Sequence, residues 1–466
     1  MGKIGMMGRF AQGSRVARFG CCRLLVTTLA GTATIAAVLV TGLSPQRAVS
    51  LPLYARQTGQ PCATCHTAFL ELTPFGRRFK LGSYTLGGGD WSGPPFAVML
   101  QPSYTHTQVG QEGGAAPHFG QNNNFAMQQV SLFTGGRITD NVGAFIQGTY
   151  DGVARRFSWD NTDIRYADTV NVGDHNLLWG VTANNNPTVQ DVWNTIPAWR
   201  FPYISSTLAP MPTASTFIEG VYAQQVVGVS AYTFFDDMLY VELGAYRPLS
   251  TRTQLALGVD TTGQSPISGI AAPYWRVAVE PNFGINSLEI GTFGLRSNVL
   301  PMGMSGAGTD SFTDIGVDTQ YQYLGDPHTV TLRASWIHEN RNLGASQALG
   351  LSDNSHDVLR SLNASVSYIY DHTWSFTAGR ISIGGTADPA LYGTFTGSPN
   401  SGGWITEIAY LPFSYGGPSL WPWMNMRIGL QYTLWDKFDG ASTNFNGAGR
   451  NAHNNNTIFV YAWTMF

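Results

Sequence analysis

From residue 95 onward, apolar and polar residues alternate along the chain with a period of two. Residues 331–336, 361–368 and 427–434 follow this alternation strictly. A period of two places successive side chains on opposite faces of an extended strand. About sixteen such segments can be counted, an even number typical of single-chain outer-membrane barrels. The last of them, residues 458–466, ends on the aromatic residue Phe466, as is typical of such barrels.

The connections between these segments are of two kinds. Short ones rich in Asp, Asn, Gly and Pro, which is tight-turn chemistry, lie at residues 139–141, 236–237, 284–286, 326–327 and 371–372. Long ones rich in Gly, Asn, Ser and Pro lie at residues 110–124, 184–217, 248–271 and 383–402. Short periplasmic turns that alternate with long external loops are characteristic of outer-membrane barrels. The pattern favours an all-β, antiparallel barrel of about sixteen strands over residues 93–466, rather than a soluble sandwich.

This pattern also predicts an orientation. Because the first connection is long, both ends of the barrel would fall on the periplasmic side, and the long loops would be extracellular. The partner of the outer surface would then be outer-membrane lipid.

Residues 1–50 have a different composition. They hold six basic residues and no acidic one, an apolar run over residues 24–43, and the small-x-small sequence Ala48-Val49-Ser50. This order is typical of an export signal peptide that is removed near Leu51. The apolar run is also long enough for an uncleaved membrane anchor, which remains the alternative.

Removal of residues 1–50 would change the charge and the cysteine content of the chain. Of the 26 basic and 29 acidic residues, 20 basic and all 29 acidic ones would remain, a net charge of about −9. Such a chain is not a nucleic-acid binder by bulk charge. Cys62 and Cys65 would be the remaining cysteines, which excludes a disulfide framework.

Residues 51–92 form a separate segment before the barrel. Thr73 followed by Pro74 predicts a helix N-terminus, and a short helix is expected over Pro74–Leu81 with Gly82 as its stop. The glycine run at residues 87–89 marks a linker. Within the segment, Cys62-Ala63-Thr64-Cys65-His66 has the C-x-x-C-H spacing of covalent haem attachment.

Two thiols three residues apart on one helical turn can reach both vinyl groups of one porphyrin, and the next residue places an imidazole under the iron. The motif therefore predicts one covalent haem c, attached through Cys62 and Cys65 with His66 as an axial ligand. A thioredoxin-like pair would need an α/β domain, and a zinc site would need further ligands nearby.

The sixth ligand of the iron is less evident. No histidine or methionine lies between His66 and Met99, and Lys80 is the local nitrogen candidate. Otherwise the ligand comes from the barrel, with Met99, His106 and Met127 as candidates, or the iron is five-coordinate. About forty residues are too few to bury a haem alone. We therefore expect the segment to sit in or against the barrel mouth, whose inner wall completes the pocket.

Charged residues add two further expectations. The arginines near the motif are candidates for contact with the haem propionates, with solvation or contact with an acidic lumen as the alternative; they are Arg56, Arg77 and Arg78. Several carboxylates fall on the polar face of their strands, either to concentrate a cation or as an ordinary lumen lining with arginine partners such as Arg276 and Arg333; they are Glu242, Glu280, Glu289 and Asp318.

Two stretches of the sequence carry a family resemblance. The first is YARQTG at residues 54–59 leading into the C-x-x-C-H motif, then LTPFGR at residues 72–77 and Phe79-Lys80. The second is GVTANNNPTVQD at residues 180–191, WNT at residues 193–195 and PAW at residues 197–199. Together they resemble the fused outer-membrane cytochrome–porin family, monohaem iron oxidases of iron-oxidising bacteria.

The resemblance implies an Fe(II)-oxidising cytochrome in the outer membrane. Extracellular Fe(II) would be the electron donor and a periplasmic c-type cytochrome or copper protein the acceptor. Residues 184–203 would form a long external loop, either folded inward over the haem or exposed. Two alternatives remain: a conduit for another extracellular donor or acceptor, and a diffusion porin whose haem is structural or sensory.

Overall fold

The computed structural model describes residues 52–87, 95–415 and 423–466. The predicted export signal at residues 1–50 and the predicted end of the cytochrome segment, residues 88–92, lie outside the described residues. Among the described residues, no helix combines the length and the hydropathy that crossing a membrane would require.

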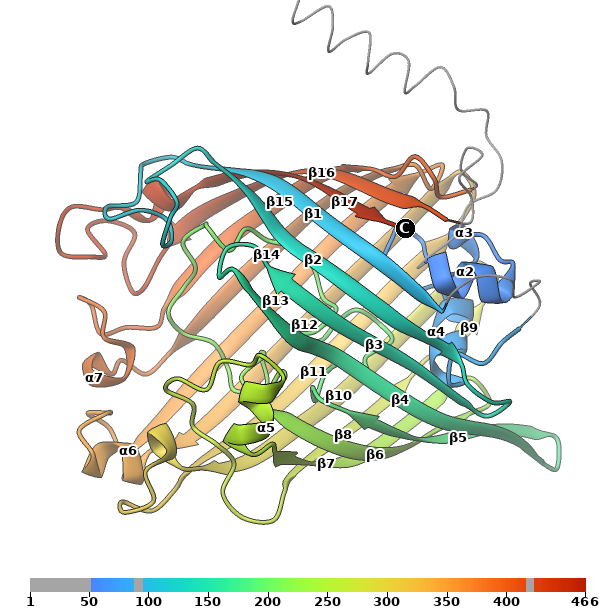
Figure 1. The fold of residues 1–466 in the computed structure, drawn as a ribbon, viewed down its shortest axis with the longest axis horizontal. Coiled ribbons are helices and arrows are strands. Elements are labelled where there is room, and N and C mark those ends of the chain that lie inside the picture. The colour runs from blue at the N-terminus through green and yellow to red at the C-terminus, as the bar shows by residue number, and fades with distance from the viewer. Residues whose placement is uncertain (1–51, 88–94, 416–422) are drawn as a thin grey trace, which may run out of the picture. The chain divides into compact units, whose positions relative to one another are not determined.

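Strands make up about half of the described chain and form one antiparallel sheet (Figure 1). The strands are β1 (Phe96–Thr107), β2 (Asn124–Arg137), β3 (Val142–Asp151), β4 (Arg156–Val172), β5 (His175–Asn184), β6 (Val226–Phe235), β7 (Leu239–Pro248), β8 (Ala272–Val279), β9 (Asn282–Phe283), β10 (Asn286–Val299), β11 (Asp310–Leu324), β12 (His328–Asn342), β13 (His356–Tyr370), β14 (Trp374–Gly385), β15 (Ser401–Tyr410), β16 (Asn425–Lys437) and β17 (Thr457–Met465).

The sheet closes on itself as a barrel. β1 pairs with β2 on one side and with β17, the last strand, on the other. β8 and β9 both pair with β10, so they are two parts of one strand interrupted at Pro281, which has no N–H for the ladder. In the described residues the barrel therefore has sixteen strands, and the predicted fold class is confirmed.

The two faces of each strand separate as a membrane barrel requires. In β13, Ser361 and Ser367 are buried towards the lumen, while Leu362 and Val366 are exposed on the outside. A soluble sandwich would bury the apolar face instead. The outer surface is apolar and the inner surface polar, so the barrel spans a membrane with lipid outside.

The connections alternate between the two ends of the barrel. The predicted tight turns all lie at one end, where β17 also finishes, and the long loops with helices α5 (Thr251–Ala256), α6 (Gly344–Ala348) and α7 (Pro389–Tyr392) lie at the other (Figure 1). Two connections depart from the alternation. β3 and β4 are joined by the short residues 152–155 at the loop end, and β15 and β16 by residues 411–424 at the turn end.

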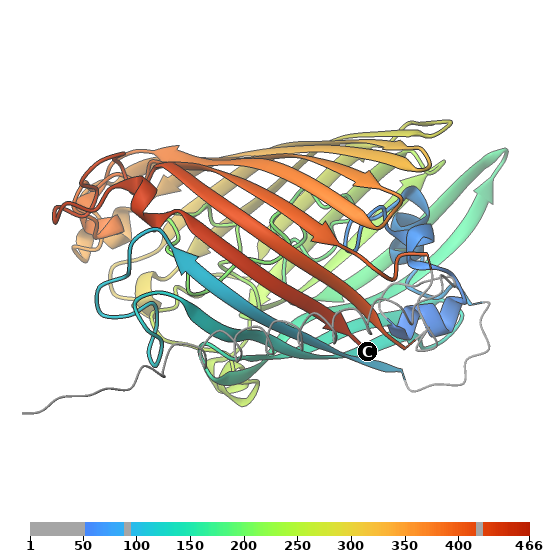
Figure 2. The ribbon, with the colours of Figure 1, turned by 90° about the horizontal axis from the view of Figure 1, so that it is seen from above.

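The helical segment before the barrel, residues 52–87, lies within the turn end of the lumen (Figure 2). It contains α2 (Pro52–Thr58), α3 (Cys62–Cys65) and α4 (Pro74–Leu81). Side chains of the segment bond the inner wall: Tyr54 Oη donates to Ala144 O at 3.1 Å, and Tyr84 Oη to Asp163 Oδ2 at 2.6 Å. The segment therefore sits in the barrel mouth, as the sequence predicts.

The connection between β5 and β6, residues 185–225, also folds into the lumen. We call it the inward loop. Val189, Trp193 and Ile196 within it are completely buried. Its backbone is held by two strands of the wall, β13 and β16: Asn363 Nδ2 donates to Phe201 O at 2.9 Å and Gln431 Nε2 to Ile204 O at 2.8 Å. Of the two expectations for this loop, the inward fold is confirmed.

Buried arginine–carboxylate pairs join the wall to the helical segment, and one of their carboxylates also bonds the inward loop. Arg77 of α4 bonds Glu280 of the wall at 2.8 Å. The second oxygen of Glu280 accepts a hydrogen bond from Trp193 Nε1 of the inward loop at 2.6 Å. Arg333 of β12 bonds Glu71 of the helical segment at 3.0 Å. Glu280 thus connects the wall, the helical segment and the inward loop at one buried point.

This arrangement predicts that Glu280→Gln will strongly destabilise the barrel. The amide leaves the buried Arg77 charge without its counter-ion, which typically costs about 3–5 kcal/mol. Denaturant unfolding of the protein in lipid vesicles, followed by tryptophan fluorescence, measures the change.

Asp436→Asn is the matched control, because Asp436 pairs with Arg380 at 2.7 Å but is about half exposed. An exposed pair contributes roughly 0–1 kcal/mol. Equal losses of unfolding free energy in the two variants would show that Glu280 is not an anchor of the lumen.

Candidate functional site

The C-x-x-C-H motif lies on one helical turn that its neighbours hold in place. The N–H of His66 bonds Cys62 O at 2.7 Å, and the N–H of Thr73 bonds Cys65 O at 2.9 Å. Thr73 is the N-cap of α4, and its Oγ1 accepts the Gly76 N–H, so the predicted helix with its cap and its Gly82 stop is confirmed. A Cβ on Gly76 would lie 2.2 Å from Cys65 O, so only glycine lets α4 approach the motif this closely.

Burial controls the ionisation of the motif. It raises the pKa of the Cys65 thiol to about 12 and that of Cys62 well above its ordinary value. Burial also lowers the pKa of His66 to about 4. The thiols are therefore protonated, unlike those of a thioredoxin-like pair, and the imidazole is neutral, the form that binds metals.

Metal sites built from protein ligands alone are not present in the described chain. No group of three or more His, Cys, Asp and Glu side chains is placed to hold an ion there. The motif therefore lacks the further ligands that a zinc site needs.

An inner cavity of about 450 Å³ lies beside the motif. This volume is in the range of cofactor sites, roughly 300–1,000 Å³. His66 and Cys65 line the cavity from the helical segment. Polar side chains such as Gln101, Gln128 and Asp160 line part of the rest, together with aromatic and sulfur-containing side chains from the barrel and the inward loop, among them Met99, Phe133, Phe145, Trp199, Trp463 and Met465. The wall thus completes the pocket, as expected for a segment too small to enclose a haem.

A haem c fits the residues at this cavity. Nδ1 of His66 is buried and has no hydrogen-bond partner among the described residues. Both cysteines are free thiols on the same turn; Cys65 lines the cavity, whereas Cys62 does not, and its Sγ accepts a hydrogen bond from Asn425 Nδ2 at 3.4 Å. Cys62, Cys65 and His66 are therefore the residues that would hold the group.

A carboxylate behind the motif ties it to both the wall and the inward loop. Glu71 Oε2 accepts from Thr67 Oγ1 at 2.9 Å, and Glu71 Oε1 accepts from Tyr203 Oη at 2.8 Å. Burial alone would raise the pKa of Glu71, but the charge of Arg333 and these hydrogen bonds lower it to about 2. Glu71 thus stays ionised and fixes the turn that follows His66.

The four predicted sixth-ligand candidates divide into two pairs. Met99 and Lys80 line the inner cavity, whereas His106 and Met127 do not. The side chain of His106 lies on the outer face of β1, alternating with the buried lumenal residues, so the prediction for it is wrong. Lys80 Nζ donates to Val189 O at 2.6 Å and to Asp191 O at 2.9 Å, so it fastens α4 to the inward loop.

None of the three arginines predicted at the propionates lines the inner cavity. Arg77 bonds Glu280, Gln320 and Gln322 of the wall. This agrees with the alternative expectation for the arginines, contact with an acidic lumen. Arg78 pairs with Asp237 of a tight turn. Arg56 donates to Phe96 O at 2.7 Å. These residues dock the segment in the barrel mouth.

The four predicted lumenal carboxylates are all buried in the barrel. Arg276 lies 2.6 Å from Asp318 and 3.4 Å from Glu289. These two carboxylates therefore agree with the expectation of an ordinary lumen lining with arginine partners. Glu242 accepts a hydrogen bond from Tyr240 Oη at 2.8 Å. Glu280 lies at the break between β8 and β9 rather than within a strand.

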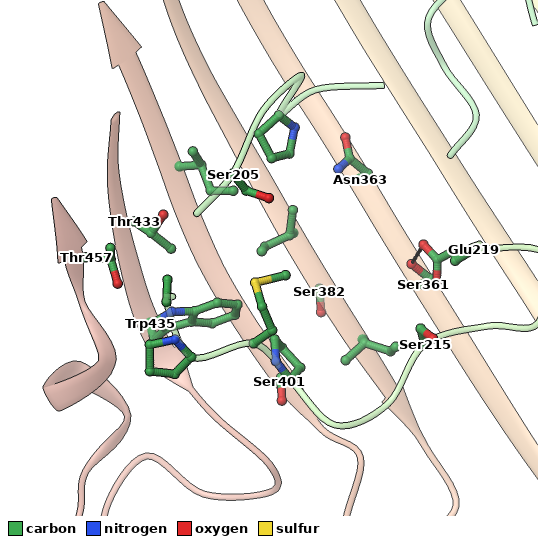
Figure 3. Close-up of a pocket in the computed structure, with 18 of the residues that line it drawn as sticks. Ser205, Ser215, Glu219, Ser361, Asn363, Ser382, Ser401, Thr433, Trp435 and Thr457 are labelled. Carbon is green, nitrogen blue, oxygen red and sulfur yellow. Dashed lines mark hydrogen bonds between the residues drawn. The ribbon is translucent and has the colours of Figure 1, made fainter. Parts of the chain in front are cut away.

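An outer cavity of about 320 Å³ lies on the other side of the inward loop. Figure 3 shows Ser215 and Glu219 of the loop facing the hydroxyl-bearing side chains of the wall, and Ser361 donates to Glu219 at 2.8 Å. Those wall residues include Ser361, Ser382, Ser401, Thr433 and Thr457. Four loop residues line both cavities: Pro197, Arg200, Pro202 and Ser205.

Two residues of the inner cavity were not predicted. Met465 is buried and lies opposite Met99 in the β1–β17 pairing, which closes the barrel. The position of Met465 near the end of the last strand was the available signal, because β17 must pair with β1. Arg200 is placed by the inward loop, for which the sequence offers no such rule.

Comparison with known proteins identifies no relative by sequence: no family model and no curated protein matches the chain. Among solved structures, the chain is similar to an anion-selective porin from Comamonas acidovorans, at 10% identity and a TM-score of 0.43, over 79% of this chain and 98% of that one. It is also similar to Salmonella typhi OmpF in complex with daunomycin, at 11% identity and a TM-score of 0.45, over 80% and 97% of the two chains. Likenesses at this level say nothing about function.

The contacts of Lys80 predict a pH-dependent contribution to stability. Burial, together with the nearby charge of Arg165, lowers its pKa from 10.5 to about 7. Between these values the unfolded chain binds more protons at Lys80 than the folded one, so the free energy of unfolding rises with pH across this window. Lys80→Met should remove that rise.

Unfolding midpoints in denaturant, measured from about pH 6 to about pH 10, test this. The exposed Lys437, substituted as Lys437→Met, is the control and should follow the wild type. Identical pH profiles for Lys80→Met and Lys437→Met would contradict the role given to Lys80.

Proposed function

We propose that this chain is an outer-membrane electron conduit with one covalent haem c inside the barrel. The observation that carries the proposal is the position of His66 and Cys65, which face a cavity enclosed by the wall, the helical segment and the inward loop. A plain diffusion channel needs no such motif. When bound, haem c supplies reversible one-electron transfer, tuned by its axial ligands and its burial.

The residues of the chain would hold, insulate and tune the cofactor. Cys62 and Cys65 would form the thioether bonds to the haem, and His66 would bind its iron. Met99 or Met465, both buried at the cavity, would supply a thioether sulfur as a further ligand. Ring contacts extend from His66 to Phe69, with 6.0 Å between the ring centroids, and from Phe69 to Trp463, with 5.1 Å between them.

The proposed donor is extracellular ferrous iron, as the family resemblance implies. Ferric iron is poorly soluble near neutral pH, so its production is best kept outside the cell. The predicted mature chain is strongly acidic, which favours the approach of a cation. The outer cavity lies on the loop side of the inward loop, where the long loops would meet the exterior.

The proposed acceptor is a soluble periplasmic cytochrome or copper protein. The helical segment lies at the turn end of the barrel, which would face the periplasm. There Ala63, between the two cysteines, donates its N–H to Ser414 O at 3.3 Å in the longer β15–β16 connection. This end is where an acceptor would come nearest to the motif.

The purified protein tests the proposal directly. It should contain one haem c per chain, and anaerobic Fe²⁺ should reduce it, seen as the sharpened absorption bands of a reduced c-type cytochrome. Cys62→Ser with Cys65→Ser should abolish covalent haem. An oxidised haem that Fe²⁺ fails to reduce at any pH would rule out iron oxidation, and a wild-type chain without haem would rule out the conduit.

A solute channel is the second candidate. The barrel architecture supports it, and the two cavities share four lining residues of the inward loop. Conductance across planar lipid bilayers separates the candidates. For a conduit, the wild-type protein should show little current, because buried ion pairs hold the helical segment and the inward loop in the lumen. A persistent open-pore current with haem bound would favour the channel.

A further inference from the structure

Three residues that line the inner cavity carry buried polar atoms without a hydrogen-bond partner among the described residues. The atoms are His66 Nδ1, Arg200 Nη1 and Trp463 Nε1. Buried polar groups in proteins are nearly always paired. Three such atoms belong to residues that line one cavity, where a molecule bound between them would supply their partners. His66 is accounted for by the proposed haem, whereas Arg200 and Trp463 are not.

Arg200 comes from the inward loop and is held from one side only. Its Nη2 pairs with Glu219, while Nη1 has no partner in the described chain. Its side chain is 19% exposed, so the cation is largely removed from water. Lys80, the other basic side chain that the described residues place on this cavity, already donates to two carbonyls of the loop.

Trp463 comes from β17 and is 6% exposed. Its ring packs edge-on against Phe69 at 5.1 Å, three residues after His66. An indole N–H is a donor only, so its missing partner is an acceptor. The two unpaired groups are thus both hydrogen-bond donors, and one of them is cationic.

A haem carries two propionate carboxylates, which are anionic acceptors. We propose that Arg200 and Trp463 are the side chains that bind the propionates of the haem, a conclusion that rests on the proposed function. Charge-assisted bonds between arginine and carboxylate are among the strongest in proteins. This assignment replaces Arg56, Arg77 and Arg78, which are used elsewhere.

In this assignment the inward loop helps to hold the haem. Because Glu219 orients Arg200 and lines the outer cavity, the loop would fasten the cofactor from the side opposite the helical segment. A positive charge at a propionate favours the reduced, less positive haem. Arg200 would therefore raise the reduction potential and lower the pKa of the propionate.

Redox titration of the purified holoprotein tests the assignment. Arg200→Gln should shift the balance between reduced and oxidised haem about tenfold towards the oxidised form, a fall of about 59 mV for one electron. The pH at which the potential changes with propionate ionisation should rise. Arg200→Lys should restore most of the potential, and Trp463→Phe, which keeps the packing, should lower it by a smaller amount.

Trp435→Phe is the matched control. Trp435 is also buried with an unpartnered Nε1, but it lines the outer cavity, so its substitution should leave the potential unchanged. Unchanged potentials and pH profiles in haem-loaded Arg200→Gln and Trp463→Phe would overturn the assignment and leave the conduit intact. A wild-type chain without haem would overturn both.

Discussion

The interior of this barrel depends on arginine–carboxylate pairs that are shielded from water. A charge without a partner in such an environment costs several kcal/mol, so a buried arginine needs a carboxylate close enough to form an ion pair. Arg77 meets Glu280, Arg333 meets Glu71, and Arg276 meets Asp318. Two of these pairs join the wall to the helical segment. The segment is therefore fixed in the mouth by the electrostatics of the wall as well as by apolar contact.

The same constraint explains why the inward loop is ordered in the lumen. Loops usually run over the surface, because their backbone groups need partners. Here the wall supplies those partners: Arg341 Nη2 donates to Ser215 O at 3.0 Å, and Asp314 accepts the N–H of Ile218 at 2.6 Å. The alternation of a β-strand places polar side chains on the lumenal face at every second position, so the wall offers partners to the loop at several points.

Much of the fold could be predicted from the sequence, because the deciding features are local. Strand alternation, tight-turn residues and the Thr73-Pro74 cap each act within a few residues, and all are found as predicted. The site was less predictable. Cys62, Cys65 and His66 are recognisable from their spacing, but the roles of Arg77 and Lys80 depend on partners more than 100 residues away. The prediction for His106 was wrong because the alternation within a single strand does not show which of its two faces is lumenal.

The helical segment and the inward loop occupy the lumen, where an open solute pore would need a continuous wet path. The inner cavity is lined by polar side chains such as Gln101, Gln128 and Asp160 as well as by aromatic and sulfur-containing ones, and it shares four lining residues of the inward loop with the hydroxyl-rich outer cavity. An electron needs no wet path, only closely spaced redox partners, so the proposed conduit does not require an open lumen. Arg200 lines both cavities, so in the proposed conduit the inward loop would be the protein layer between the outer cavity and the cavity beside His66.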